Sequence, residues 1–255
     1  MALQIGTAFQ DGIDELLSER GALFAGAFIV YGLLNAVVWA SLSQGLTELL
    51  LAQFPSEAQV NQAAMAGGTP LALDLPLAVA GIGALALFVV NEALSIVAIR
   101  AFASDDRDPI PDNVGRRLGK TVAIAIAAGI LTGIATAIGF VLLIIPGLVL
   151  IVLFFFVRQE IALNDSGIIE SISNSVGIVS DNLLATAVLA IALAVLGFVV
   201  GFAFQSLPLP LPAMASTTIT TVASSVVTVF GIAVTTVAYL QATEPAHEAD
   251  PVGGL

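Results

Sequence analysis

The sequence predicts an all-α fold: a polytopic transmembrane helix bundle with six spans and two amphipathic helices at the membrane interface. Hydrophobic residues make up 58% of the 255 residues and charged residues only 10%, whereas soluble domains have about 45–50% apolar and about 25% charged residues. The mean hydropathy of +1.04 agrees with this. No hydrophilic stretch is long enough to fold separately, so we expect one membrane domain over residues 21–241.

The N-terminal residues 1–20 predict an amphipathic helix. Ile5, Phe9, Ile13 and Leu16 recur at spacings of four, four and three residues, which is helical periodicity. The opposite face is acidic and lacks the basic residues that attract such helices to anionic lipid. We therefore expect this helix to pack under the bundle.

Six apolar runs are expected to cross the membrane. Residues 121–157 form a run of 37 residues without a charge. As one helix they would measure about 55 Å, too long for a single crossing of a hydrocarbon core about 30 Å thick. The pair Pro146-Gly147 is the expected structural turn within this run. The expected spans are residues 22–42, 77–99, 121–144, 147–163, 183–204 and 216–240.

The segments between the spans are more polar. A loop with Pro55, Gly67, Gly68 and Pro70 follows the first span. Leu207 to Pro212 alternates leucine with proline, which excludes a helix. The acidic tail, residues 242–255, is expected to be disordered.

A second interfacial helix is expected in residues 164–182, capped by Asn164 or Asp165. Its apolar residues at helical spacing are Ile168, Ile169, Ile172, Val176 and Val179.

The basic residues predict the orientation. Arg20 precedes the first span, five basic residues separate the second span from the third, and Arg158 lies late in the fourth. The loops after the first, third and fifth spans have none. Because basic residues favour the cytoplasmic side, we expect a multi-pass protein of the cell membrane with both termini in the cytoplasm.

The charge balance and two scarce residue types exclude several functions. There are 19 acidic and 7 basic residues, a net charge of −12, which argues against a nucleic-acid partner and leaves membrane lipid as the expected one. Such acidity is typical of proteins from a halophilic archaeon, with an ordinary acidic protein as the alternative. There is no cysteine, and His247 in the tail is the single histidine. Thiolate and histidine metal sites, cofactors and enzymatic activity are therefore not expected.

Charged residues inside the spans are the candidate site. Asn91 and Glu92 lie in the second span, and Arg158 and Glu160 lie in the fourth; together they could form an intramembrane polar network. Glu92 and Arg158 are expected at depths that agree within about one helical turn. A structural ion pair, a proton or ion relay, and an Arg158 that reaches the interface by itself all remain open.

Small and hydroxyl residues mark further helix faces. Small residues recur every four positions in the third span and again in the fifth, which favours close helix packing within the monomer or in a homo-oligomer. The hydroxyls of the sixth span could line a polar pathway or bond to the preceding turn. The small residues are Ala125, Gly129, Gly133, Ala137, Gly197 and Gly201, and the hydroxyls are Thr217, Thr221, Ser224, Ser225, Thr228, Thr235 and Thr236.

One part of the chain resembles a known group of proteins. Residues 142–148 read Leu-Leu-Ile-Ile-Pro-Gly-Leu, and residues 170–175 read Glu-Ser-Ile-Ser-Asn-Ser. The region 120–185 resembles six-span prokaryotic membrane proteins of unknown function, among them the membrane domain of some glycerophosphodiester phosphodiesterases and the YciC-like proteins. The resemblance implies an Ile-Pro-Gly turn and an amphipathic segment from Glu170 to Ser175. The two usual basic positions of that segment are Ser173 and Asn174 here.

Two functions remain in competition at this point. The first is a non-enzymatic accessory or scaffold protein of the envelope. The alternative is a small transporter or channel that uses Glu92, Arg158 and Glu160. A cavity at mid-depth reached by Glu92 would favour transport, and a filled, dry bundle would favour the scaffold.

Overall fold

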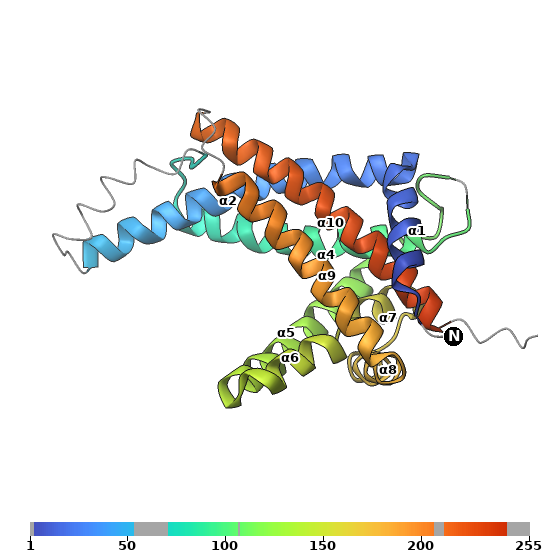
Figure 1. Ribbon diagram of the computed structural model, residues 1–255. Helices are drawn as coiled ribbons and strands as arrows, with labels where there is room; N and C mark the ends of the chain where they lie inside the picture. The colour runs from blue at the N-terminus through green and yellow to red at the C-terminus, as the bar shows by residue number, and fades with distance from the viewer. Residues whose placement is uncertain (1–2, 54–70, 107, 207–211, 244–255) are drawn as a thin grey trace, which may run out of the picture.

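The computed structural model describes residues 3–53, 71–106, 108–206 and 212–243 and is helical through most of them (Figure 1). Six helices among these residues are long and apolar enough to cross a membrane, which confirms the predicted six-span helical bundle. The elements are α1 (Ile5–Leu17), α2 (Glu19–Gln53), α4 (Leu77–Phe102), α5 (Leu118–Leu142), α6 (Ile144–Leu153), α7 (Val157–Asn164), α8 (Ile168–Asp181), α9 (Leu183–Ser206) and α10 (Ala213–Thr243).

An elbow at Ser18 separates α1 from the first spanning helix, α2. Ser18 has an extended backbone. Its hydroxyl donates to the carbonyl of Glu15 at 2.6 Å and accepts from the N–H of Gly21 at 3.0 Å. A Cβ at Gly21 would lie 2.2 Å from the Glu15 carbonyl oxygen, so the elbow needs glycine there. The helix predicted over residues 1–20 therefore ends earlier, at Leu17.

Helix α1 lies across the end of the bundle and packs on α10 (Figure 1). Phe9 tilts against Phe230 of α10 at 5.8 Å between ring centroids. Helices α1 and α10 approach each other most closely at small residues of α1. Ala8 is fully buried, and Gly12 lies directly against Val234 of α10. Ile13, predicted to belong to the buried stripe, is 45% exposed. Ile5, Phe9 and Leu16 of the predicted stripe pack against the core, so the apolar spacing identified most of the face that packs under the bundle.

The spanning helices are longer than several of the predicted spans. Helix α2 continues to Gln53, 35 residues in all and about 52 Å long, because no proline interrupts it. The helix thus extends beyond both ends of the predicted first span, residues 22–42. The loop predicted around Pro55 and Gly67, most of the Leu-Pro connector and the tail lie outside the described residues.

The third and fourth spans form a hairpin that reverses at Leu143. Leu143 has an extended backbone and separates the end of α5 from the start of α6. Pro146 and Gly147, the predicted turn, instead lie inside the first turns of α6, where proline is tolerated because early helical N–H groups have no intrahelical partner. Gly147 lets α6 approach α5 closely, since a Cβ there would lie 2.5 Å from the ring of Phe140.

The fourth spanning segment runs from Ile144 to Asn164 and is interrupted between α6 and α7. Residues 154–156 form a turn between them. Ser175 of α8 bridges this break: its hydroxyl donates to the carbonyl of Leu153 at 2.8 Å and accepts from the N–H of Phe156 at 3.2 Å. Backbone groups freed inside a membrane need such partners, so one buried hydroxyl stabilises the interruption.

Helix α8 is found within the predicted interfacial segment, but its cap differs from the predicted Asn164 or Asp165. Gly167 is the N-cap, and its N–H donates to the Glu170 carboxylate at 3.2 Å. Asn164 ends α7, and Asp165 follows in the left-handed region with φ 54°. The two residues predicted as N-caps of α8 therefore lie at the C-terminal end of α7.

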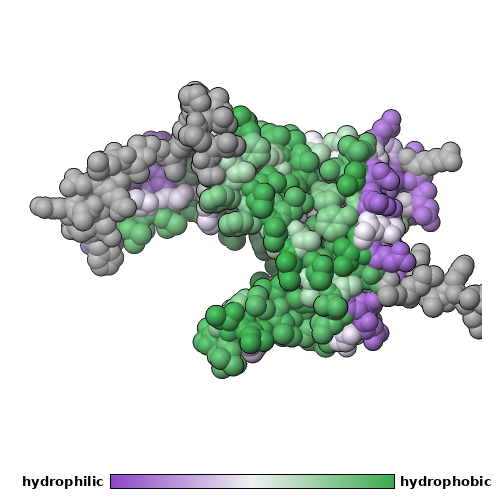
Figure 2. All heavy atoms as spheres, in the orientation of Figure 1, coloured by the Kyte–Doolittle hydropathy of each residue, from purple (hydrophilic) through white to green (hydrophobic). Residues whose placement is uncertain are grey.

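The α5–α6 hairpin stands apart from the remaining spanning helices (Figure 1), and the hollow between the two parts is visible in the space-filling view (Figure 2). Hydrophilic residues gather at the end that carries α1 and α8 (Figure 2). Four glycines of the small-residue faces have open space beside them: a Cβ at Gly129, Gly133, Gly197 or Gly201 would meet no atom within 4 Å, whereas Ala125 of the same row is buried in the core. Packing of these glycines within the chain, one of the two expected roles, is therefore not observed.

Candidate intramembrane site

A cavity of about 590 Å³ lies between α4, α5, α7, α9 and α10, and we call it the charged cavity. Its polar lining consists of Glu92, Thr132, Arg158, Gln159, Thr228 and Thr235. Its walls are otherwise apolar, with Phe88, Ile130, Phe154 and Leu193 among them. A mostly apolar pocket with a few polar groups, of about 300–1,000 Å³, is typical of small-molecule sites.

Glu92 and Arg158 form an ion pair in this cavity. Arg158 Nη2 lies 2.8 Å from Glu92 Oε1, which joins α4 to α7. The Glu92 side chain is buried, whereas 47% of the Arg158 side chain is exposed. The pair is therefore not a sealed internal bridge, because its cationic end remains accessible.

Two side-chain oxygen atoms of residues that line this cavity lack a hydrogen-bond donor within the described residues. They are Glu92 Oε2 and Gln159 Oε1, on side chains of residues that are 6% and 5% exposed. A buried polar atom without a partner costs about 1–3 kcal/mol. Both atoms are also inaccessible to a water-sized molecule, so they lie behind the cavity wall and not on its open surface.

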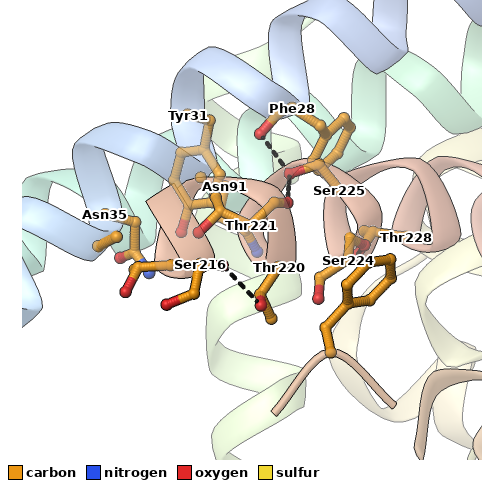
Figure 3. Close-up of a pocket in the computed structure, with 14 residues that line it drawn as sticks. Phe28, Tyr31, Asn35, Asn91, Ser216, Thr220, Thr221, Ser224, Ser225 and Thr228 are labelled. Atoms are coloured by element: carbon orange, nitrogen blue, oxygen red, sulfur yellow. Dashed lines mark hydrogen bonds between the residues drawn. The ribbon is translucent and has the colours of Figure 1, made fainter. Parts of the chain in front are cut away.

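A second cavity, of about 660 Å³, lies between α2, α4 and the first half of α10 (Figure 3). We call it the hydroxyl cavity. It is lined by Tyr31, Asn35 and Asn91 together with a row of α10 hydroxyls, and none of its lining residues is charged. The α10 hydroxyls are Ser216, Thr217, Thr220, Thr221, Ser224, Ser225 and Thr228.

Several of the α10 hydroxyls bond to the preceding turn and line the cavity at the same time. Thr220 donates to the Ser216 carbonyl at 2.9 Å and Thr228 to the Ser224 carbonyl at 2.9 Å. Ser225 is shared between the Thr221 and Phe28 carbonyls. The side chains of Asn35 and Asn91 make no hydrogen bond within the described residues and point toward this space (Figure 3). The α10 hydroxyls therefore fill both roles expected from the sequence: they bond to the preceding turn, and they line a polar space.

The two cavities meet at α4 and α10. Asn91 lines the hydroxyl cavity and the next residue, Glu92, lines the charged one. Thr228 lines both. Along α10 the hydroxyl cavity covers residues 216–228 and the charged cavity residues 228–235, so the charged cavity lies nearer the end that carries α1. Asn91 does not join Glu92 in one network, contrary to the grouping made from the sequence.

Glu160, the fourth predicted member, belongs to a separate cluster. Its Oε1 accepts from the Tyr239 hydroxyl at 2.7 Å, and its Oε2 accepts from Asn164, Asn174 and Ser166 at 3.1–3.3 Å. These neutral donors come from α7, α8, α10 and the connection between α7 and α8. Glu160 is 3% exposed and lines neither cavity. Its hydrogen bonds connect α7 to α8 and α10.

The arginines of the predicted cytoplasmic side clamp the connection between α4 and α5. Arg20 donates to the carbonyls of Ala101, Ser104, Asp106 and Asp108. Arg100 binds the carbonyls of Val114, Arg116 and Ala162 and forms an ion pair with Asp165 at 2.9 Å. These two side chains are satisfied by the protein itself, and we take the polar lining of the two cavities as the candidate functional site.

Sequence reasoning missed Gln159, Tyr31 and Asn35 as lining residues. Gln159 directly follows Arg158 in a span, and Asn35 interrupts the apolar first span, so uncharged polar residues within spans were the available signal. The packing of the helices decides which of these polar side chains line the same cavity.

Comparisons with known proteins place the chain in a family. Residues 3–242 match a family described as a domain of unknown function, DUF7847. No curated protein and no solved structure matches the chain. An uncharacterised family was expected, whereas the likeness to the phosphodiesterase membrane domain and to YciC-like proteins is not shown. Since the match covers nearly the whole chain, the protein belongs to the DUF7847 family.

Proposed function

We propose that this membrane protein is a small, non-enzymatic transporter or channel that moves a small solute through the two cavities. The observation that carries the proposal is their junction: Thr228 lines both, and the neighbours Asn91 and Glu92 each line one. We further propose that the protein lies in the cell membrane with both termini in the cytoplasm and has membrane lipid as its surrounding partner.

The broken fourth span supports this proposal. Non-helical backbone is tolerated at membrane depth where it is buried in protein or lines a cavity, and discontinuous helices form substrate sites in many transporters. Phe154 and Phe155, at the break between α6 and α7, line the charged cavity. Val157 and Arg158 at the start of α7 line it as well.

The scaffold alternative accounts for less of the geometry. A bundle that only organises other proteins gains nothing from polar side chains that line a cavity without a partner. The unbonded Asn35 and Asn91 amides of the hydroxyl cavity are explained if a polar solute passes them.

The first test asks whether water reaches the junction. The chain has no cysteine, so a single introduced cysteine is labelled uniquely. In proteoliposomes, Thr228→Cys and Thr221→Cys are expected to react with a charged methanethiosulfonate reagent. Ile82→Cys, at a position 69% exposed on the apolar outside of α4, is the matched control and should be protected by lipid. Protection of both cavity positions would exclude an aqueous path.

The second test measures movement of solutes. Proteoliposomes are given a radiolabelled panel of amino acids, sugars, polyols and inorganic ions, before and after the reagent is attached to Thr228→Cys. We expect at least one solute to enter faster before the modification. Equal uptake of every solute in both states would overturn the proposed function.

A further inference from the structure

We propose that the hydroxyl cavity binds an uncharged polyhydroxy solute, a sugar or an open-chain polyol. This inference names the substrate class of the proposed transporter and so rests on that function for its purpose. Binding to the cavity is tested separately from transport.

The lining of the hydroxyl cavity contains polar side chains that the protein leaves unbonded. Two carboxamides and three hydroxyls make no side-chain hydrogen bond within the described residues. They come from three helices and are Tyr31 and Asn35 of α2, Asn91 of α4, and Thr221 and Ser224 of α10. Tyr31 and Asn35 are four residues apart and therefore lie on one face of α2.

These unbonded groups are open to the cavity. Among the described residues, the unpartnered side-chain atoms that are closed to a water-sized molecule belong to Glu92, Gln159 and Thr186. None of those three residues lines the hydroxyl cavity. Asparagines in membrane proteins commonly bond across to a neighbouring helix. Asn35 and Asn91 instead point into the space beside the α10 hydroxyls (Figure 3).

A solute with several hydroxyls matches the donors and acceptors of this lining. A hydroxyl both donates and accepts, and a carboxamide offers two N–H donors and one acceptor oxygen. Thr220, Ser225 and Thr228 donate to backbone carbonyls, which leaves their oxygen lone pairs as further acceptors. A polyol can therefore satisfy the free groups of all three helices at once.

The absence of charge from the lining selects an uncharged solute. None of the described residues that line the cavity is charged, so an ion would have no counter-charge between membrane helices, where desolvation is costly. Glu92 follows Asn91 in the chain, but it lines the other cavity and is paired with Arg158 at 2.8 Å.

The aromatic walls and the size of the cavity fit the carbon skeleton of such a solute. Phe28, Tyr31 and Phe204 provide apolar ring surface for its C–H groups. The volume of about 660 Å³ is within the range of about 300–1,000 Å³ for small-molecule sites. At about 30 Å³ for each water, the space exceeds what a few structural waters fill. Sugars and open-chain polyols share this chemistry, so the experiment uses one probe of each kind.

Binding is measured as protection of a cysteine in the cavity wall. Ser224→Cys, in the otherwise cysteine-free full chain, is purified in detergent at molar salt and treated with a water-soluble methanethiosulfonate reagent. We expect D-glucose or D-sorbitol to slow its modification. Asp105→Cys, at an exposed position between α4 and α5, is the control and should react at the same rate with and without the solute. A Ser224→Cys that never reacts would overturn the inference, because no aqueous space would reach the site.

A matched series of solutes tests the two chemical requirements. N-methyl-D-glucamine and D-gluconate keep the polyol chain but carry an ammonium or a carboxylate, and hexanediol keeps the carbon chain but has only two hydroxyls. Each should need an at least about tenfold higher concentration than the protecting sugar or polyol for half-protection of Ser224→Cys. Equal protection by hexanediol, or by either charged solute, would overturn the inference.

Variants of the two asparagines test the assigned contacts. In the Ser224→Cys chain, Asn35→Leu and Asn91→Leu keep the size of the side chain and should each raise the half-protecting concentration about tenfold. Gln44→Leu is the matched control, because Gln44 is also a carboxamide of α2, lines neither cavity and bonds to Glu48. Equal protection in all three variants would overturn the inference. If an asparagine variant fails to fold, the series of solutes on Ser224→Cys decides by itself.

The remaining outcomes separate the two sources and the two proposals. Protection by D-glucose alone would identify a sugar as the ligand, and protection by D-sorbitol alone an open-chain polyol. If neither protects, the cavity holds water only and the inference is wrong. Protection without uptake of any solute into proteoliposomes would overturn only the proposed transport function. Uptake of another solute without protection by either probe would overturn only this inference.

Discussion

Arg158 Nη2 and Glu92 Oε1 lie 2.8 Å apart although 66 residues separate them in the chain. The pair links α4 to the second half of a broken span, α7. It also lies at a cavity instead of in a sealed core. Because of this position, the effect of the ion pair on protein stability can be measured separately from its effect on solute binding.

The first prediction concerns the energy of this pair. Glu92→Gln and Arg158→Met are each expected to destabilise the protein, with less effect than the about 3–5 kcal/mol typical of a fully buried pair, because Arg158 is half exposed. The double variant should recover part of the loss, with a coupling energy of about 0.5–3 kcal/mol. Equilibrium unfolding in mixed micelles measures this cycle, and strictly additive losses would show that the two charges do not interact.

The second prediction concerns the hydroxyl that bridges α6 and α7. Ser175→Ala removes the partner of both the Leu153 carbonyl and the Phe156 N–H, and we expect a loss of about 1–3 kcal/mol. Ser180→Ala is the control in the same helix, because Ser180 is exposed and bonds only to the Val176 carbonyl. Equal unfolding free energies for the two variants would mean that the broken span does not depend on Ser175.

The third prediction concerns the contact of α1 with α10. A Cβ at Gly12 would lie 2.4 Å from Val234 Cγ2 and 3.2 Å from the Val234 backbone, so Gly12→Ala should destabilise by about 1–3 kcal/mol through overpacking. Gly6→Ala, in the same helix with open space around it, should not. Limited proteolysis of the N-terminal segment reports the release of α1, and identical cleavage of both variants would contradict this packing.

The fourth prediction concerns topology. Single cysteines at Ser56 and Ser206 should react with an impermeant reagent on intact cells, and one at Asp106 should not, because every basic residue is expected on the cytoplasmic side. Lysed cells are the control for reactivity of all three. Reaction at Asp106 alone on intact cells would reverse the orientation.

The fifth prediction concerns salt. Arg20, Arg100 and Arg116 bond to the protein's own carbonyls, whereas many acidic residues of α1, of α8 and of the connection between α4 and α5 stay exposed. These include Asp11, Asp14, Asp105, Asp108, Asp112 and Asp181. Repulsion among these carboxylates is screened only at high salt. The purified protein should therefore be monodisperse and more heat-stable at molar salt than at low salt. A melting temperature that does not change with salt would contradict the halophilic origin.

The sequence by itself determined the helical membrane fold and the number of spanning helices. Long uncharged runs specify spans because hydrocarbon satisfies no backbone polar group. It also singled out Glu92 and Arg158, since charges inside spans are rare and need partners. Both conclusions depend only on the local composition of the chain, which the sequence gives directly.

Tertiary structure decided where the helices break and which polar residues converge. The reversal lies at Leu143 and not at Pro146-Gly147, because proline fits the first turn of a helix as well as a loop. The interruption between α6 and α7 is stabilised by Ser175 of α8, so no local sequence pattern predicts it. Gln159 reaches the same cavity as Glu92, and Glu160 turns away to Tyr239, because neighbouring residues on a helix point about 100° apart. Whether a given side chain reaches a cavity depends on how the neighbouring helices pack, and the packing depends on residues throughout the chain.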